Sequence, residues 1–414
     1  MNASQPRPLE GLTILDLTTA LAGPYATLLL AGLGARVIKI ENPSNPDTMR
    51  NNAPYLGRDG VTLQKRGVDD LSLSLLERGR NKLGVTLNLK SEEGRAMFID
   101  LARHADAVVE NFSAGTADRL GIGYAALSRV NPRLVYTSIS GFGADELGGQ
   151  NRAMDTIVQA LSGLMMTSGL VGDAPVRVGV PIGDLCAPLY ATIGTLAALL
   201  QAQRTGQGQH VDVSLLGALT SVVACEQSDV MERLGQSTRT GNTLTRLAPF
   251  GVFAAADGHV AICSPTDKFV AALFGAMGTP DLAKDLRFSS RDQRVKHADE
   301  LHALVEAWTL TLPAAQVVET LGALGVPCGE VRTPGEAVRD ARALRRGETT
   351  RLEHPQYGEA DDVVVTGLPI RMSGAFTGFD RPAPHLGEHN ASVYAELLGL
   401  NDEQLRALAA RQVI

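Results

Sequence analysis

The stretch LTILDLTTALAGPYATLLLAGLGARVIKIE, residues 12–41, decides the fold. Its first six residues (12–17) form a short apolar run of strand length, and the segment from Pro24 to Gly32 has the length and composition of a helix. The last six residues, RVIKIE (36–41), predict a second strand with alternating faces. Strand, helix and strand in this order predict a βαβ unit with parallel strands.

The same pattern returns further along the chain. Strands are predicted at 84–89, 107–112 and 134–140, with a helix that Ser91 opens between the first two, and QHVDVSLL (209–216) predicts another. Strands that alternate with helices predict an α/β fold with a Rossmann-like, doubly wound parallel sheet. Aromatic residues make up only 4% of the chain, which suits helices packed on strands.

A chain of 414 residues is too long for one ordinary core. We predict that residues 1–220 form the N-terminal part of a large domain and that 335–414 return to it. Residues 221–334 are predicted to form a smaller α+β domain, with a hairpin at 250–263 that turns at Asp257-Gly258. Residues 42–82 are rich in Asn, Pro, Gly and charge, and we expect them to form a loop that covers a site.

Composition excludes several classes of function. The chain has 38 Lys and Arg against 45 Asp and Glu, so its charge of -7 offers no general attraction to nucleic acid or to an anionic membrane. The longest apolar stretch, 189–200, is shorter than the roughly 20 residues that a bilayer requires, so we expect no membrane span. No secretion signal opens the sequence, and the four cysteines lie far apart without metal-ligand spacing. We therefore expect a cytoplasmic protein without a metal site.

The first βαβ unit does not fit a nicotinamide dinucleotide. That use requires G-x-G-x-x-G at the turn after the first strand, where backbone N–H groups approach the pyrophosphate. Here the turn reads Ala20-Leu21-Ala22-Gly23-Pro24, and Pro24 has no N–H to donate.

Two aspartates are candidates for chemistry. Asp184 follows Gly183 and precedes an apolar helix, so it has the position of an N-cap, and Asp155 is similarly placed before another helix. Capping and catalysis are compatible, since a carboxylate at the start of a helix can meet an incoming ligand.

Basic side chains gather at strand ends and loops of the first half of the chain. These residues are Arg80, Lys82, Lys90, Arg119 and Arg152. They are either solvated surface residues or together form a site for a multiply phosphorylated ligand. Asn111 and Phe112 end a strand just before Arg119, so these three residues are candidates to line one pocket. His385 and His389 lack a third ligand and are interpreted as structural or interfacial.

Over nearly its whole length the sequence resembles the class III CoA-transferases, the family that includes formyl-CoA transferase and the carnitine CoA-transferases. The resemblance rests on ordered blocks: LEGLTILDLTTALAGPYAT (9–27), GARVIKIE (34–41), NKLGVTLNLKSEEG (81–94), AVVENFSAGTADRLGIG (107–123), DTIVQALSGLMMTSG (155–169), GDLCAPLYATIGTLAALLQAQRTGQGQHVDVSL (183–215), GVPCGEV (325–331) and PHLGEHN (384–390).

The resemblance implies a transferase that moves coenzyme A from an acyl-CoA to a carboxylic acid, with Asp184 as the nucleophile. It implies an interlocked homodimer, and acyl-CoA as a substrate rather than any tightly bound cofactor. It also implies the residues that contact CoA: Leu21, Ala22, Asn42, Leu87, Asn88, Leu89, Lys90, Asn111, Phe112, Ser113, Arg119, Arg152, Met154 and Asp155. Leu21 stands where some members carry Gln, and Asn42 replaces an Arg that contacts the nucleotide in others.

Two other functions remain open. The α-methylacyl-CoA racemases of the same superfamily use a Gly-His-Asp segment as part of a proton-transfer pair, whereas this chain reads Ala153-Met154-Asp155 and lacks the His. A non-catalytic CoA-binding subunit is the third reading, and the retained Gly183-Asp184 argues against it. The acyl group is not specified, although Arg58, Arg66 and Arg78 are candidates to hold a second carboxylate of a dicarboxylic acid, against the alternative of ordinary surface charge.

Overall fold

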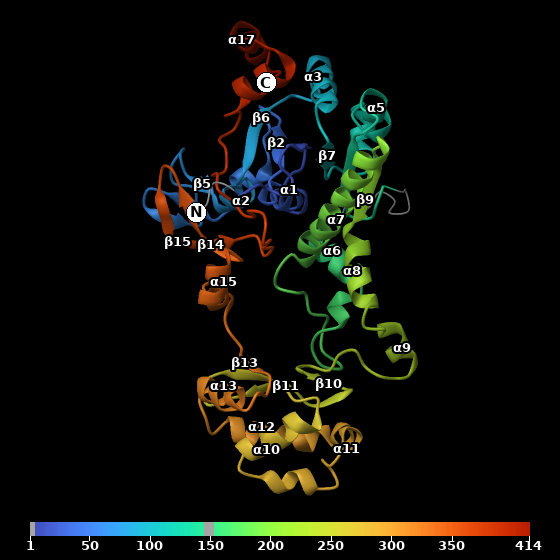
Figure 1. Cartoon of the computed structure of the whole chain (residues 1–414), viewed down its shortest axis with the longest axis vertical. Coiled ribbons are helices and arrows are strands. Elements are labelled where there is room, and N and C mark those ends of the chain that lie inside the picture. Colours follow the sequence, from blue (N-terminus) through green and yellow to red (C-terminus); the bar gives the residue numbers. More distant parts are fainter. Residues whose placement is uncertain (1–4, 145–152) are drawn as a thin grey trace. The chain divides into compact units, whose positions relative to one another are not determined.

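The computed structural model describes residues 5–144 and 153–414, which form two compact units (Figure 1). Unit 1 consists of Met1–Leu164, Arg177–Glu226 and Val338–Ile414. Unit 2 consists of Met165–Val176 and Gln227–Ala337.

Unit 1 is built on a sheet of six parallel strands in the order β6-β2-β1-β7-β8-β9. The strands are β1 (Thr13–Asp16), β2 (Arg36–Glu41), β6 (Lys82–Thr86), β7 (Ala107–Glu110), β8 (Val135–Ser140) and β9 (His210–Ser214). Counted along the chain within this sheet, the order is 3-2-1-4-5-6, which is the strand order of the Rossmann fold. The predicted doubly wound parallel sheet is confirmed.

Helices cover both faces of this sheet. One core cluster joins the sheet to α1 (Ala22–Gly32), α6 (Asp155–Leu161), α7 (Ile182–Thr205) and α8 (Leu215–Ala224). A second joins it to α3 (Glu92–Arg103), α5 (Tyr124–Val130), α16 (Asn390–Leu398) and α17 (Asp402–Ala410). Strands of a parallel sheet covered on both faces are buried throughout. Lys39 and Glu41, which the alternation in RVIKIE placed on a polar face, are therefore buried.

The ends of several helices follow from local sequence. Ser91 caps α3 by accepting a hydrogen bond from the N–H of Gly94, and Asn401 forms a reciprocal capping box with Gln404 at α17. Gly206 ends α7 with φ 73°, a left-handed conformation that glycine adopts without strain. The expected start of α7 is wrong, because the helix begins at Ile182, so Asp184 lies in its first turn and is not the N-cap.

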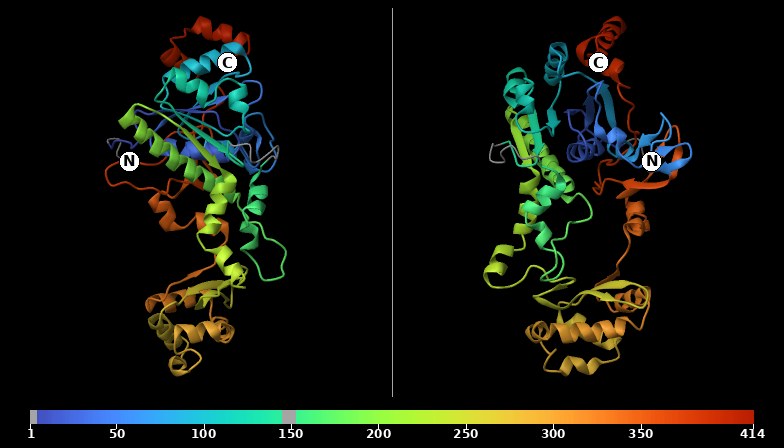
Figure 2. Two further views of the ribbon diagram at one scale, coloured as in Figure 1. Left: turned by 90° about the vertical axis from the view of Figure 1, so that its right-hand side faces the viewer. Right: turned by 180° about the vertical axis from the view of Figure 1, so that it is seen from behind.

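Residues 42–82 are not a loop. They contain a 3-10 turn η1 (Thr48–Asn51), strands β3 (Tyr55–Gly57), β4 (Gly60–Thr62) and β5 (Leu71–Ser72), and helix α2 (Leu73–Arg78). Their apolar side chains share a small core with the antiparallel hairpin of β14 (Thr349–His354) and β15 (Gly358–Thr366). The right view of Figure 2 shows these light-blue and orange-red segments side by side. The partners are almost 300 residues apart, so the sequence around 42–82 gave no sign of this core.

Helix α7 has the length and composition to cross a membrane, with 24 residues and a mean hydropathy of 1.5 over its most apolar window. The core helix of a soluble protein passes the same test. Ala187, Ala191, Ala198 and Leu199 pack into the core of unit 1, and α7 contacts α1, α8 and β8. We therefore interpret α7 as a core helix.

Unit 2 has an antiparallel sheet in the order β10-β11-β12-β13. Its strands are β10 (Thr243–Leu244), β11 (Leu247–Ala254), β12 (His259–Cys263) and β13 (Cys328–Glu330). The hairpin predicted at 250–263 is confirmed, with Ala254 opposite His259. The helices that pack on this sheet include α10 (Asp267–Ala276), α12 (Ala298–Thr309) and α13 (Ala314–Ala323), and α9 (Ser228–Arg233), η4 (Pro280–Lys284) and α11 (Arg291–Lys296) complete the unit.

Three short elements lie close in sequence to the residues at which the chain passes from one unit to the other. They are η3 (Leu164–Met166), α14 (Pro334–Val338) and α15 (Ala341–Arg346).

Candidate active site

The predicted ligand-binding segments follow the carboxyl ends of neighbouring strands. Leu21 comes after β1, Asn42 after β2, Leu87–Lys90 after β6 and Asn111–Ser113 after β7. In open α/β sheets ligands bind at this edge, at the point where the strand order reverses. That point lies here between β1 and β7.

Hydrogen bonds between side chains and backbone hold these segments together in pairs. Asn111 accepts from the N–H of Thr19 at 2.8 Å and donates to the carbonyl of Thr19 at 2.9 Å, which ties the end of β7 to the turn after β1. Asn42 donates to the amide oxygen of Asn88 at 3.3 Å, and the N–H of Leu87 donates to the carbonyl of Glu41 at 2.7 Å. The structure thus ties Asn111 to the turn that carries Leu21, and it separately brings Asn42 and Asn88 together.

A buried network of charged side chains fixes the backbone at this edge of the sheet. Lys82 donates to Asp16 at 2.9 Å, and Lys39 donates to Asp47 at 2.8 Å, with all four side chains at most 2% exposed. Burial alone would raise the pKa of Asp16, but Lys82 and Lys39 hold it below its usual value. Asp47 also accepts from the N–H of Ala20 at 2.9 Å, so the network fixes the turn that enters α1.

Two of the basic residues proposed for a phosphorylated ligand are structural. Lys82 is enclosed by Asp16, Thr27 and the carbonyl of Pro24. Arg80 donates to the carbonyls of Glu77 and Thr366, and its guanidinium lies over a phenyl ring. These assignments were wrong because a sequence cannot show that a charge at a strand end is paired and covered.

Asp155 organises the start of α7. Its carboxylate accepts from the N–H of Gly183 at 2.8 Å and from the amide of Gln159 at 2.7 Å. Gln159 is fully buried and also accepts from the N–H of Val178 at 2.9 Å. Asp155 and Gln159 therefore fix the backbone on which Asp184 is carried.

Asp184 is half-buried in the first turn of α7. Burial raises the pKa of its carboxyl to about 6, repulsion from Asp155 adds to the rise, and Arg78 opposes it. A carboxyl with this pKa is ionised near neutral pH yet poorly solvated, a combination that favours reaction with an electrophile.

Arg78 links the two parts of the site. This last residue of α2 interacts electrostatically with both Asp47 and Asp184. Since Asp47 holds the turn after β1, the nucleophile candidate and the switch point of the sheet belong to one region of unit 1.

The other predicted contact residues differ in exposure. The side chains of Ala22 and Leu87 are in the core, so they can offer a ligand only backbone atoms. Lys90, Arg119, Ser113 and Met154 are exposed, whereas Leu21, Leu89 and Phe112 are partly buried. Arg152 lies outside the described residues.

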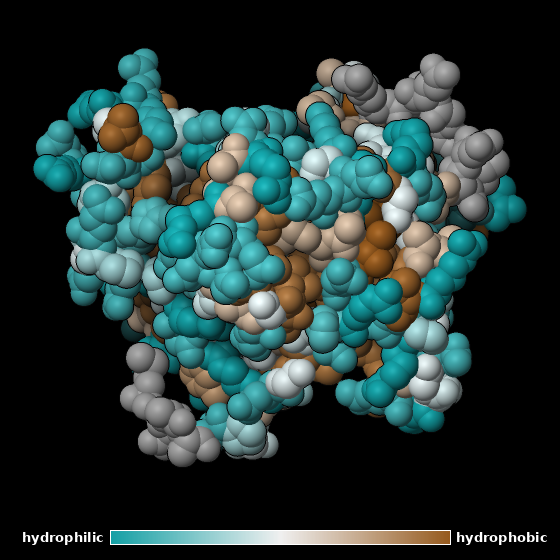
Figure 3. Space-filling model, turned by 90° about the horizontal axis from the view of Figure 1, so that it is seen from above, coloured by the Kyte–Doolittle hydropathy of each residue, from teal (hydrophilic) through white to brown (hydrophobic). Residues whose placement is uncertain are grey.

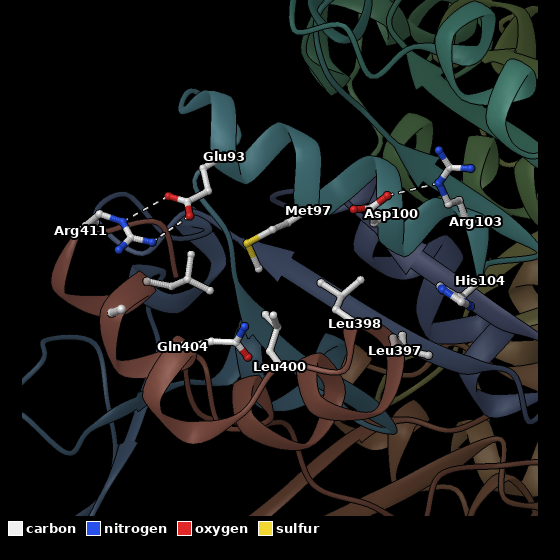
Figure 4. A pocket seen from close by; sticks show the side chains of 12 residues that line it. Glu93, Met97, Asp100, Arg103, His104, Leu397, Leu398, Leu400, Gln404 and Arg411 are labelled. Atoms are coloured by element: carbon white, nitrogen blue, oxygen red, sulfur yellow. Dashed lines mark hydrogen bonds and ion pairs between the residues drawn. The ribbon is translucent and has the colours of Figure 1, made fainter.

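A cavity of about 500 Å³ lies elsewhere in unit 1, between α3 and the α16–α17 segment (Figure 4). Glu93 and Arg411 form an ion pair at its rim, and Met97, Leu398 and Leu400 line it. It contains none of the predicted site residues. His389 accepts from the N–H of Gly84, as a structural residue does, and the described part of the chain contains no cluster of three or more metal-ligating side chains.

Gln159 was not identified from the sequence, and Arg78 was named only as one of three arginines that are candidates to hold a second carboxylate. Gln159 is one glutamine within an apparently apolar helix, and only its position four residues after Asp155 could have suggested a role. Arg78 was one of three arginines in a supposed loop, with nothing local to separate it from Arg58 and Arg66.

Several known proteins are similar to this chain in sequence and fold. The family model described as CoA-transferase family III matches residues 9–390. The chain is 36% identical to the succinyl-CoA--D-citramalate CoA-transferase of Chloroflexus aurantiacus, over 99% of this chain and 98% of that protein. It is 37% identical to the acetyl-CoA:oxalate CoA-transferase of Acetobacter aceti, over 94% of this chain and 95% of that protein.

A crystal structure of a CAIB/BAIF family protein from Brucella suis superimposes with a TM-score of 0.81 and 32% identity, covering 95% of this chain and all of that one. The match of sequence and fold extends over nearly the whole chain. The protein belongs to CoA-transferase family III.

Proposed function

We propose that this enzyme transfers coenzyme A from an acyl-CoA to a carboxylic acid through covalent intermediates on Asp184. The observation that carries the proposal is the state of this carboxylate, which is half-buried, raised in pKa to about 6 and carried on a backbone that Asp155 fixes. Members of the family act on acyl-CoA and carboxylate substrates, as the names of the relatives state.

The reaction proceeds in balanced steps. The carboxylate of Asp184 attacks the thioester carbonyl of the donor, the C–S bond breaks, and an aspartyl anhydride and CoA thiolate result. The thiolate attacks the aspartyl carbonyl and releases the donor acid, which leaves an aspartyl-CoA thioester. The acceptor carboxylate attacks this thioester, and the released thiolate then takes the acceptor acyl group and restores Asp184.

A carboxylate is suited to this exchange because each intermediate stays as activated as the thioester that formed it. No metal, nucleotide or prosthetic group is required by these steps. Partial burial protects the anhydride from water, and the N-terminal end of α7 favours the negative charge that develops beside it.

Coenzyme A is proposed to lie along the carboxyl edge of the sheet. The segments that would contact it are Leu21 and Ala22, Asn42, Leu87–Lys90, Asn111–Ser113, Arg119 and Arg152–Asp155. Their support is the position of most of them at the ends of adjacent strands, where Asn111 and Asn42 already order the backbone. Asn42 is engaged with Asn88 and with the N–H groups of Ser44 and Asn45, so it contacts a nucleotide less readily than an arginine would.

The substrate acids are proposed to include a dicarboxylate. Succinyl, citramalate and oxalate groups in the relatives' names are all dicarboxylic. Racemisation is less well supported, because Met154 occupies the place of the missing His and its side chain, 75% exposed, carries no exchangeable proton.

A cytoplasmic homodimer is proposed as the working form. Large apolar side chains of α7 are exposed in the single chain, with Leu189, Ile193 and Leu200 between 46% and 64% exposed. Figure 3 shows that apolar residues gather in a central area of the face seen from above, bordered by hydrophilic residues. Exposed apolar surface of this kind is typical of protein interfaces. Sedimentation of the purified protein tests this part of the proposal.

The covalent step is tested by intact mass spectrometry. The purified enzyme is incubated with a panel of short acyl-CoAs, trapped with hydroxylamine or borohydride, and compared with Asp184→Ala and with the exposed control Asp402→Asn. A donor-dependent adduct on the peptide that contains Asp184, present in the control and absent in Asp184→Ala, is the expected result.

If both variants still form the adduct, Asp184 is excluded as the nucleophile. Exchange of the α-proton of an acyl-CoA, without any adduct in the wild type, would replace transfer with racemisation.

A further inference from the structure

Arg78 has a charged side chain without an adequate partner. Its side chain is 12% exposed, and its Nε atom is buried with no hydrogen-bond acceptor among the described residues. Its nearest anionic partner is Glu77, with 3.8 Å between Nη1 and Oε2, a distance too long for a hydrogen bond. A guanidinium has five N–H donors, and leaving a buried donor unsatisfied is costly.

The other enclosed arginines nearby are satisfied by the protein. Arg50 forms a two-pronged pair with Glu41, at 2.8 and 2.6 Å. Arg80 donates to two backbone carbonyls at 2.9 and 2.6 Å. Arg78 differs from both, and buried polar groups without partners are rare enough in proteins to need an explanation.

The anions around Arg78 are committed elsewhere. Asp47 accepts from Lys39 and from the N–H groups of Ala20 and Met49. Glu77 accepts from the N–H of Thr366 at 3.2 Å. The remaining neighbour is Asp184, which must stay free to react. No acceptor for the Nε atom of Arg78 lies among the described residues, and the partly exposed guanidinium can still meet a carboxylate from outside the chain.

The position of Arg78 is suited to contact with a substrate that reacts at Asp184. It ends α2, and α1 packs against both α2 and α7, the helix whose first turn carries Asp184. The charge of Arg78 also acts on the carboxyl of Asp184, where it opposes the rise in pKa.

We propose that Arg78 binds the distal carboxylate of a dicarboxylic acyl group whose other carboxyl carbon reacts at Asp184. This inference rests on the proposed transferase function and names the residue that selects the substrate class. Arginine pairs with carboxylates through two parallel N–H donors, so the site favours a dicarboxylic acyl group over a monocarboxylic one of equal length.

The two other arginines of the same segment do not share this place. Arg58 and Arg66 are exposed and line a separate cavity of about 220 Å³ together with Asp59, Asp69 and Asp70. Three aspartates in that cavity already balance the two positive charges. Arg66 is therefore a matched control for Arg78.

The test compares succinyl-CoA with butyryl-CoA, which has the same number of carbon atoms and lacks the distal carboxylate. Wild type, Arg78→Gln, Arg78→Lys and Arg66→Gln are assayed for kcat/KM and for covalent adduct on Asp184. Truncating one partner of an enclosed charge pair costs about 30-fold or more in affinity. We expect Arg78→Gln to lose about that factor with succinyl-CoA and to change by less than about 3-fold with butyryl-CoA.

Arg78→Lys keeps the charge and loses the paired donors, so a selective loss of about 10-fold for succinyl-CoA is expected, and Arg66→Gln should match wild type. Should Arg78→Gln fail to fold, as circular dichroism would show, Arg78→Lys carries the same comparison.

Equal losses for both thioesters would mean that Arg78 acts on Asp184 alone and would overturn the proposal, as would a wild type that prefers butyryl-CoA. Failure of the transferase function looks different, because then no acyl-CoA would leave an adduct on wild-type Asp184. An adduct from butyryl-CoA without preference for succinyl-CoA would overturn only the role of Arg78.

Discussion

Replacing Asp184 by asparagine should make the protein more stable above neutral pH while abolishing transfer. The folded state holds the proton of Asp184 more tightly than the unfolded chain, since burial and Asp155 raise its pKa from 3.8 to about 6. Ionising this group therefore opposes folding. The penalty is absent well below pH 3.8, grows between pH 3.8 and about 6, and is constant above.

The size of this penalty follows from the two pKa values. The rise from 3.8 to about 6 corresponds to at most about 3 kcal/mol, at about 1.4 kcal/mol per pKa unit. Solvent screening at a half-buried position reduces this to about 1–2 kcal/mol. The free energy of unfolding of Asp184→Asn should exceed that of the wild type by this amount at about pH 8, and by only about a third of it at about pH 4.5.

Urea denaturation followed by circular dichroism at the two pH values measures the gain. Any effect of asparagine that does not depend on pH cancels in the difference between them. Asp402→Asn is the matched control, since Asp402 also lies in the first turn of a helix but is exposed, and it should show no such difference. A gain for Asp184→Asn that is equal at both pH values, or a loss near pH 8, would refute the assignment of a poorly solvated carboxylate.

Three further outcomes are expected. Acylation of Asp184 should fall to half its plateau near pH 6, because only the carboxylate attacks and its pKa is about 6; rapid-quench measurements that give a flat profile would contradict this. Asp155→Asn removes a like charge and should move that midpoint to lower pH, so an unchanged midpoint in the same assay argues against the coupling. Lys82→Met leaves the buried carboxylate of Asp16 without its partner and should destabilise the protein by about 3–5 kcal/mol in urea titrations. A loss below about 1 kcal/mol would mean that Asp16 takes up a proton or is paired well enough by Lys39.

Local signals in the sequence determined the core architecture. Apolar runs of strand length, separated by helices with polar caps, specify the parallel sheet, because strand and helix periodicity are properties of neighbouring residues. The cap at Ser91, the capping box at Asn401 and the glycine that ends α7 are equally local, and all three are present in the structure. The ordered family blocks likewise sufficed to identify the family.

Only the tertiary structure decided which charges are buried and which are available to a ligand. In the sequence, Lys82 and Arg80 look like exposed basic residues. In the structure they are enclosed by the sheet, by α1 and by the backbone of Thr366. Arg78 was indistinguishable from Arg66 along the chain. What separates them is that the buried Nε of Arg78 has no acceptor among the described residues and that its charge acts on Asp184. Desolvation and pairing depend on residues hundreds of positions away, so no local pattern records them.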